Sequence, residues 1–221
     1  MTRQTAAPGA DATDRAGTTK RAGVIDVVLF DLGGVIADFA GLPVMAGLAG
    51  LSEEAAAVRW LMSPWVRRFE SGNCSEQEFA AGVVTEWGFP LSPSQFLDSF
   101  VSWLGDPFDG AEQMVRDTGA QVTVGCLSNT NELHWRTVIS EWPLTALFEH
   151  RFLSFELRAV KPDREVFERA VAALPVPPER VLFIDDNALN VEGALAAGLQ
   201  AQQARGVAEA RAVLARHALL G

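Results

Sequence analysis

Charged and hydroxyl side chains follow three apolar segments of the chain. Asp31 follows the run VIDVVLF and Ser128 follows QVTVGCL, while Asp185 and Asp186 end the run VLFI. Lys161 stands directly before Pro-Asp, ahead of the third run. One aspartate after one apolar run is usually a turn or helix-capping residue. Several such positions in one chain instead predict a shared site of carboxylates, a hydroxyl and a lysine.

The chemistry of this set is consistent within itself. Carboxylates that meet at one edge repel each other, so a cation must lie among them or one must be protonated. Mg²⁺ together with Lys161 would balance the charges of Asp31, Asp185 and Asp186, and an all-oxygen ligand set suits Mg²⁺. An aspartate kept ionised in this way is a nucleophile toward phosphorus. Ser128 and the backbone N–H groups after it can hold a phosphoryl oxygen.

A parallel sheet is the element that brings these residues together. The three apolar runs are nearly continuous, as expected for strands buried on both faces. Helical patterns separate and follow the runs, at 108–118, 131–141, 163–174, 187–197 and 207–217. This alternation predicts an α/β fold with a doubly wound parallel sheet, whose ligand site lies at the carboxyl ends of the strands.

One segment interrupts the alternation of strands and helices. Residues 38–106 show helical patterns only, and one of them begins with the capping-box sequence SEQE. The patterns lie at 52–62, 65–70, 75–87 and 93–103. We therefore expect an all-helical insert at 38–106, within an α/β core formed by 23–37 and 107–221. Residues 1–22 are rich in Ala, Thr and Gly without an aromatic residue, which predicts a disordered tail.

Composition narrows the class of protein. The 221 residues carry a formal net charge of −10, with 48% hydrophobic and 21% charged residues, as in an ordinary soluble globular protein. The acidic balance argues against a protein that binds nucleic-acid backbones, and without a run of 18 apolar residues we expect no membrane span. Two cysteines and no apolar signal segment favour a cytoplasmic protein.

The ordered motifs resemble those of the haloacid dehalogenase (HAD) superfamily. FDLGGV, LSNTN, the lysine of KPD and FIDDNALNVEGALAAG follow each other as in the group with a helical cap after the first strand, and FESGNCSEQEF matches the cap. The first motif is similar to that of bacterial sugar-phosphate phosphatases of the glucose-1-phosphatase-like kind. The resemblance implies a Rossmann-like core and Mg²⁺-dependent hydrolysis of a small phosphorylated metabolite, such as a sugar phosphate, through an aspartyl-phosphate.

The resemblance also assigns metal ligands. Asp31 would be both the nucleophile and a ligand of Mg²⁺. The backbone carbonyl of Gly33 and the carboxylate of Asp186 would complete the protein ligands, with Asp185 binding directly or through water. The site therefore implies one resident cofactor, Mg²⁺.

The phosphoryl group of the substrate would be held by three further residues. Ser128 would donate a hydrogen bond to it, and Lys161 would neutralise charge on the nucleophile and on the transferring group, so both count as catalytic. Asn129 would orient the substrate or the backbone around it, and Asn187 or Asn190 would support the metal loop.

Gly33 is a departure from the family pattern. Most phosphatases of the superfamily carry a second aspartate two positions after the nucleophile, as general acid and base. Help of this kind is worth about 10²–10⁴-fold in rate. Either another group, among them Asp38, His134 and Glu70, replaces it, or the leaving group needs no proton.

Two other functions stay open. Without the second aspartate, the chain can be a catalytically degenerate module that only binds or regulates. A 2-haloacid dehalogenase uses the same nucleophile without a metal, so Asp185 and Asp186 argue against that activity. The sequence leaves the substrate and the oligomeric state undetermined.

Overall fold

A five-stranded parallel sheet forms the centre of the protein. In this computed structural model, which describes residues 24–220, the strand order is β5-β4-β1-β6-β7. The strands are β1 (Val27–Phe30), β4 (Thr123–Ser128), β5 (His150–Leu153), β6 (Val181–Asp185) and β7 (Gln200–Gln203). All neighbours pair in parallel, and β1 lies between β4 and β6. The predicted doubly wound α/β fold is confirmed.

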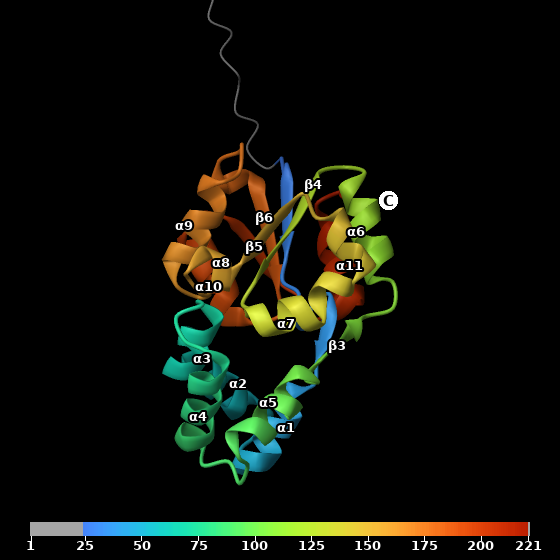
Figure 1. Ribbon diagram of the computed structural model, residues 1–221. Helices are drawn as coiled ribbons and strands as arrows, with labels where there is room; N and C mark the ends of the chain where they lie inside the picture. The colour runs from blue at the N-terminus through green and yellow to red at the C-terminus, as the bar shows by residue number, and fades with distance from the viewer. Residues whose placement is uncertain (1–23, 221) are drawn as a thin grey trace, which may run out of the picture.

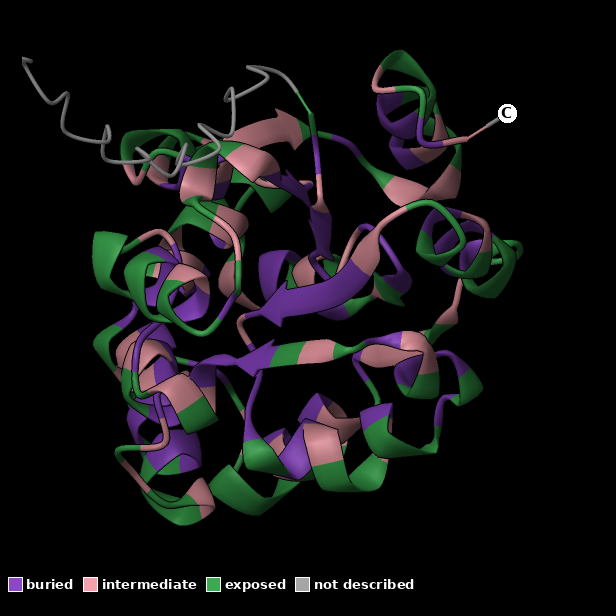
Figure 2. Cartoon of the chain, turned by 90° about the horizontal axis from the view of Figure 1, so that it is seen from above, coloured by how far each residue is buried: buried purple, intermediate pink, exposed green. Residues whose placement is uncertain are grey.

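Helices cover both faces of the sheet. They are α6 (Ala111–Gly119) and α11 (Gly206–Arg216) on one face, and α9 (Arg164–Ala172) and α10 (Ala188–Ala196) on the other (Figure 1). Side chains alternate along β1, so Val28 and Phe30 pack with the first pair while Val27 and Leu29 pack with the second. Seen from above, the buried strands run between partly exposed helices (Figure 2). This burial on both faces explains the continuous apolar runs.

Five helices form a second part below the carboxyl edge of the sheet, the helical cap (Figure 1). They are α1 (Gly41–Ala49), α2 (Glu53–Met62), α3 (Pro64–Glu70), α4 (Glu76–Trp87) and α5 (Pro93–Val101). A serine side chain accepts a hydrogen bond at the start of α2, α3, α4 and α5. The cap has its own core, in which Phe79 packs edge to face with Trp60 and with Phe100.

Two short antiparallel strands join the cap to the sheet. β2 (Ala37–Phe39) and β3 (Leu104–Pro107) pair where the chain enters and leaves the cap. The expectation of helices alone in 38–106 is therefore wrong at both ends of that segment. The pairing provides hydrogen-bond partners for the backbone N–H and C=O groups of the two segments that connect the cap to the sheet.

The structure also contains elements that the sequence patterns did not predict. Strand β7 has the sequence QAQQ and lies at the edge of the sheet, so no apolar run marks it. Helix α1 has Ala40 at its N-cap without a side-chain hydrogen bond, so the usual start signal is missing. Strand β5 and helix α8 (Ser154–Leu157) are short.

Helix α7 (Glu132–Thr137) is shorter than the predicted helix at 131–141. The rest of the predicted segment contains a separate 3₁₀ turn over Ile139–Glu141.

No helix in the described part of the chain is long and apolar enough to cross a membrane. The predicted tail at 1–22 lies outside the described residues.

A buried histidine links the core to the cap. Nε2 of His134 in α7 lies 2.8 Å from the carbonyl oxygen of Phe100 in α5, and Nδ1 lies 3.2 Å from Nδ2 of Asn131. A carbonyl accepts and an amide nitrogen donates, so this geometry fits the neutral imidazole. Burial accordingly lowers the pKa of His134.

This histidine predicts how stability depends on pH. Its pKa is lower in the folded protein than in the unfolded chain, so the unfolded chain binds the extra proton as the pH falls below about 6.5, which favours unfolding. The raised pKa values of the Asp31 and Glu70 carboxyls act in the opposite direction, so the prediction is a difference between two proteins: when the pH is lowered from about 7.5 to about 5.5, the melting temperature should fall more, or rise less, in the wild-type protein than in His134→Gln. Equal slopes in the two proteins, measured by thermal unfolding, would contradict this account.

Two glycines of the cap predict opposite effects of the same substitution. A Cβ on Gly82 of α4 would lie 2.1 Å from Cδ2 of Trp65, whereas a Cβ on Gly47 of α1 meets nothing within 4 Å. Gly82→Ala should therefore lower the free energy of unfolding by about 1–3 kcal/mol through overpacking. Gly47→Ala should raise it by about 0.5–1 kcal/mol because alanine loses less backbone entropy. Urea denaturation followed by tryptophan fluorescence measures both changes.

Candidate active site

Three central strands bring predicted site residues to one edge of the sheet. Asp31 follows β1, and Asp185 is the last residue of the neighbouring strand β6, with Asp186 next to it. One carboxylate oxygen from each of the three lies within 4.8 Å of the others. Ser128 ends β4, on the other side of β1, and is buried.

Lys161 is fully buried at the centre of this cluster. Its Nζ lies 2.9 Å from Oδ1 of Asp31 and 2.6 Å from Oδ2 of Asp185, and it donates to the carbonyl oxygen of Leu127 at 3.0 Å. Each of its three N–H groups thus has an acceptor, which a buried ammonium requires. Burial opposes the charged form, but Asp185 and Asp31 outweigh it and raise the pKa of Lys161.

Asp31 has one occupied and one available oxygen. Its Oδ1 accepts the N–H of Leu32 at 2.8 Å and lies beside Lys161, whereas no hydrogen bond from the described residues reaches Oδ2. Burial raises the pKa of Asp31 to about 8; Lys161 acts against this, and Asp185 and Asp186 add to it. One lysine therefore does not compensate the buried negative charge.

The uncompensated negative charge indicates that the site suits a metal cation in addition to Lys161. Burial and Asp185 also raise the pKa of Asp186. The available donors are carboxylate and backbone oxygens, which hard divalent cations such as Mg²⁺ prefer. The residues present therefore fit a magnesium ion.

Asparagines fix the orientation of Asp185. Its Oδ1 accepts the backbone N–H of Asn187 at 2.8 Å, and Nδ2 of Asn190 lies 3.1 Å from both carboxylate oxygens. Asn187 also caps α10 through the N–H of Leu189. Both asparagines thus support the acidic loop, as the sequence analysis expected.

Asn129 clasps the segment that carries Lys161. Its Oδ1 accepts the backbone N–H of Lys161 at 2.8 Å, and its Nδ2 donates to the carbonyl oxygen of the same residue at 3.1 Å. The sequence analysis expected Asn129 to orient the substrate or the backbone, and in the structure its amide contacts the backbone of Lys161 and positions that residue. Within residues 24–220, the hydrogen-bond contact of the Ser128 hydroxyl is a long one, 3.5 Å to the carbonyl oxygen of Asn129.

Gly34 is a site residue that sequence reasoning did not single out. Its φ is +77°, and a Cβ there would lie 2.5 Å from the carboxylate of Asp186. Only glycine allows the loop after β1 to approach Asp186 so closely. The consecutive glycines of FDLGGV were the signal for this approach.

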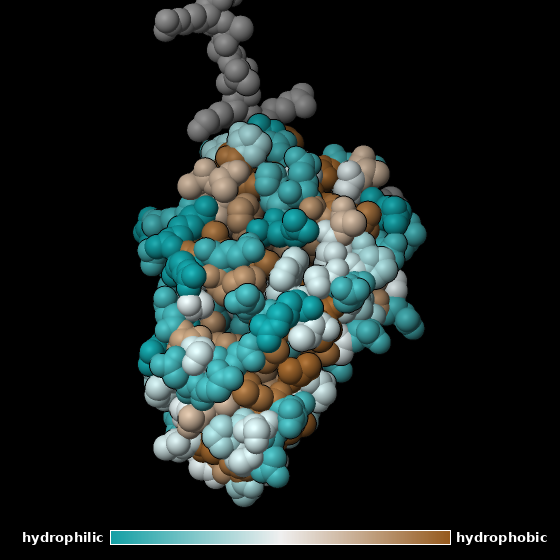
Figure 3. Space-filling view, viewed as in Figure 1, coloured by the Kyte–Doolittle hydropathy of each residue, from teal (hydrophilic) through white to brown (hydrophobic). Residues whose placement is uncertain are grey.

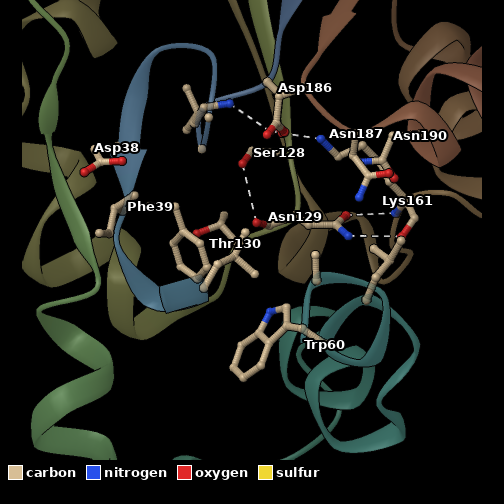
Figure 4. A pocket seen from close by; sticks show the side chains of 18 of the residues that line it. Asp38, Phe39, Trp60, Ser128, Asn129, Thr130, Lys161, Asp186, Asn187 and Asn190 are labelled. Carbon is tan, nitrogen blue, oxygen red and sulfur yellow. Dashed lines mark hydrogen bonds and ion pairs between the residues drawn. The ribbon is translucent and has the colours of Figure 1, made fainter. Parts of the chain in front are cut away.

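A cavity of about 780 Å³ opens between the acidic edge and the cap. Asp31, Ser128, Lys161 and Asp186 line its core side, and Trp60 lines its cap side (Figure 4). Its other cap-side residues include the apolar Phe39, Leu42, Pro43, Ala57, Val58, Leu61 and Phe100 and the carboxylates of Glu53, Glu54 and Glu70. Apolar side chains also reach the outer surface in the lower, helical part of the molecule (Figure 3). A cavity of this size suits a small molecule.

Comparisons with known proteins agree with this arrangement. A model of the haloacid dehalogenase-like hydrolases matches residues 25–198. An HAD family enzyme, BT-2542 of Bacteroides thetaiotaomicron, solved with magnesium and inorganic phosphate, is 23% identical over 82% of this chain and 94% of its own, with a TM-score of 0.64.

Two further solved structures are similar. A predicted HAD-like hydrolase from Porphyromonas gingivalis is 23% identical over 87% of this chain and 97% of its own, with a TM-score of 0.66. L-2-haloacid dehalogenase from Xanthobacter autotrophicus is 22% identical over 81% and 77%, with a TM-score of 0.60. At these identities the likeness concerns the fold.

Removing the buried ammonium group of Lys161 should strongly lower the free energy of unfolding. Lys161→Met leaves Asp31 and Asp185 buried without their partner, so we expect the free energy of unfolding to fall by about 3–5 kcal/mol. Chemical denaturation in EDTA measures this without a compensating metal. In the matched variant Arg164→Met, which removes an exposed cation paired with Glu168, the change should stay below about 1 kcal/mol. Similar losses in both variants would contradict the prediction.

Proposed function

The chain belongs to the haloacid dehalogenase-like hydrolases, and from this membership we propose that it is a Mg²⁺-dependent phosphatase of small phosphorylated metabolites. The observation that carries the proposal is the cluster of Asp31, Lys161, Asp185 and Asp186, which carries more negative charge than one lysine balances and of which Asp31, Lys161 and Asp186 line the cavity. This arrangement suits a metal ion and an anionic phosphoryl group together.

Mg²⁺ would be held by Asp31, Asp186 and the backbone carbonyl of Gly33, with Asp185 beside them. When bound, the ion would neutralise negative charge on the phosphoryl oxygens and on the attacking carboxylate. The magnesium and phosphate complex of the structurally similar BT-2542 supports this assignment.

The side chains divide the remaining chemistry. Oδ2 of Asp31, the oxygen without a hydrogen bond from the described residues, would attack phosphorus and form an aspartyl-phosphate. Lys161 holds Oδ1, so it orients the nucleophile, and together with bound Mg²⁺ it would keep the carboxylate ionised. The Ser128 hydroxyl and the backbone N–H groups after β4 would donate to the phosphoryl oxygens. Water would then hydrolyse the intermediate.

The cavity favours a substrate whose phosphate is its only anionic group. Among the described residues, its cationic side chains are Lys161 and Arg205. Two arginines of the cap are engaged elsewhere: Arg59 with the carbonyl of Glu86, and Arg67 with Asp163. A second anionic group would therefore lack a partner on the cap, whereas hydroxyl groups beside Trp60 would not need one. We accordingly propose a sugar phosphate or polyol phosphate.

Hydrolysis of p-nitrophenyl phosphate tests the function. We expect turnover with Mg²⁺, loss of turnover in EDTA and recovery when Mg²⁺ is restored. Asp31→Asn should lower the rate at least about a thousandfold because the nucleophile is lost. Asp98→Asn, which changes an exposed aspartate on α5, is the matched control and should keep the wild-type rate.

Separate measurements identify the alternative functions. Chloride release from 2-chloropropionate in EDTA would indicate a dehalogenase. Stabilisation by phosphorylated ligands without phosphate release would indicate a binding module. Full turnover in Asp31→Asn would contradict the proposed mechanism. A screen of hexose phosphates for phosphate release tests the substrate class.

A further inference from the structure

The active site lacks a proton donor where the family places one. An alkoxide is a poor leaving group, so hydrolysis of a sugar phosphate gains from protonation of the departing oxygen. Gly33 has no side chain for this task, although a Cβ there would meet only the Cβ of Phe39, at 3.9 Å. The position has room for a side chain but carries none. A proton for the departing oxygen would therefore come from a group on another element that reaches the cavity.

Two of the three candidates are unsuitable. Both ring nitrogens of His134 are already engaged, by Asn131 and by the carbonyl of Phe100. Asp38 is exposed on β2, and Figure 4 places it on the far side of the pocket from Lys161 and Asp186. Neither group is both free and close to the phosphoryl site.

Glu70, the last residue of α3, is anchored over Lys161 from both sides. One turn before it, Arg67 forms an ion pair with Asp163, two residues after Lys161. Two residues after it, the carbonyl of Gly72 accepts a hydrogen bond from Arg158, which lies three residues before Lys161. The end of α3 is thus tied at two points to the core segment that carries the catalytic lysine, and Glu70 lines the cavity between these ties.

We propose that Glu70 is the general acid and base of this hydrolase, in place of the side chain missing at Gly33. The proposal rests on the proposed phosphatase function and adds a catalytic residue to it. Burial raises the pKa of Glu70 to about 7, although Lys161, Arg67 and a hydrogen bond with Trp60 act in the opposite direction. A carboxyl group with a pKa near the working pH both gives and takes a proton readily.

The proton transfers balance over two steps. Asp31 forms a bond to phosphorus while the bond to the leaving oxygen breaks; that oxygen keeps the electron pair and takes the proton of Glu70, leaving as an alcohol. The Glu70 carboxylate then takes a proton from water as the water oxygen attacks phosphorus. The bond to Asp31 breaks, its electron pair returns to the carboxylate, and inorganic phosphate leaves.

Two aryl phosphates separate these steps. Nitrophenolate leaves without protonation, whereas phenolate is more basic and gains from an acid. With p-nitrophenyl phosphate, Glu70→Gln should give a burst of about one nitrophenolate per enzyme at nearly the wild-type rate, followed by turnover slowed about 10²–10⁴-fold. With phenyl phosphate, the burst itself should be slowed by a similar factor.

Two variants make the test specific. Gly33→Asp, placed in the Glu70→Gln protein, restores a carboxyl group in the open space and should recover turnover at least about tenfold. Asp98→Asn, the matched control, removes an exposed cap carboxylate that does not line the cavity and should leave both rates unchanged. Thermal unfolding confirms that each variant folds.

Each failure has its own meaning. An active wild-type protein with unchanged turnover in Glu70→Gln overturns the role of Glu70 alone. Equal slowing of the burst on both substrates indicates a structural defect and also overturns it. A folded wild-type protein that releases no phosphate from either substrate with Mg²⁺ contradicts the proposed phosphatase function, and the role of Glu70 with it.

Discussion

The buried ammonium group of Lys161 is the interaction on which the site depends. It joins the ends of three adjacent strands, through Asp31 after β1, the carbonyl of Leu127 in β4 and Asp185 in β6. Without it, two carboxylates would be buried beside each other, so the lysine makes the acidic edge compatible with folding. Asn129 holds the lysine in turn, and the same short segment anchors α3 through Asp163.

Burial decides which parts of the fold are visible in the sequence. The inner strands are buried on both faces and appear as apolar runs, so β1, β4 and β6 were predicted. Edge strand β7 is a run of partly exposed Gln and Ala residues, and local patterns do not mark it. β2 and β3 pair with each other although the whole cap separates them in the sequence. Their pairing therefore depends on tertiary structure, and a short stretch of sequence does not reveal it.

The site shows the same division. The residues at strand ends were predicted because the ends of adjacent parallel strands must meet. The clasp of Asn129 on Lys161 and the position of Glu70 depend on how distant segments pack. The sequence named Glu70 only as one of three candidates, whereas the structure distinguishes it by its anchors and by the occupied ring of His134. Chemistry at strand ends is local information, and chemistry across the cavity is not.

The paired strands β2 and β3 make the cap a single excursion of the chain that leaves and rejoins the sheet at one place. Substitutions within its five helices therefore change the wall that meets the leaving group while the strands that carry Asp31, Ser128 and Asp185 stay intact. In the proposed phosphatase, substrate selectivity is thus encoded in the cap and phosphoryl chemistry at the strand ends, with Glu70 on α3 as the exception. Substitutions of the cap around Glu70 would therefore alter the substrate that fits while leaving the strand-end residues in place.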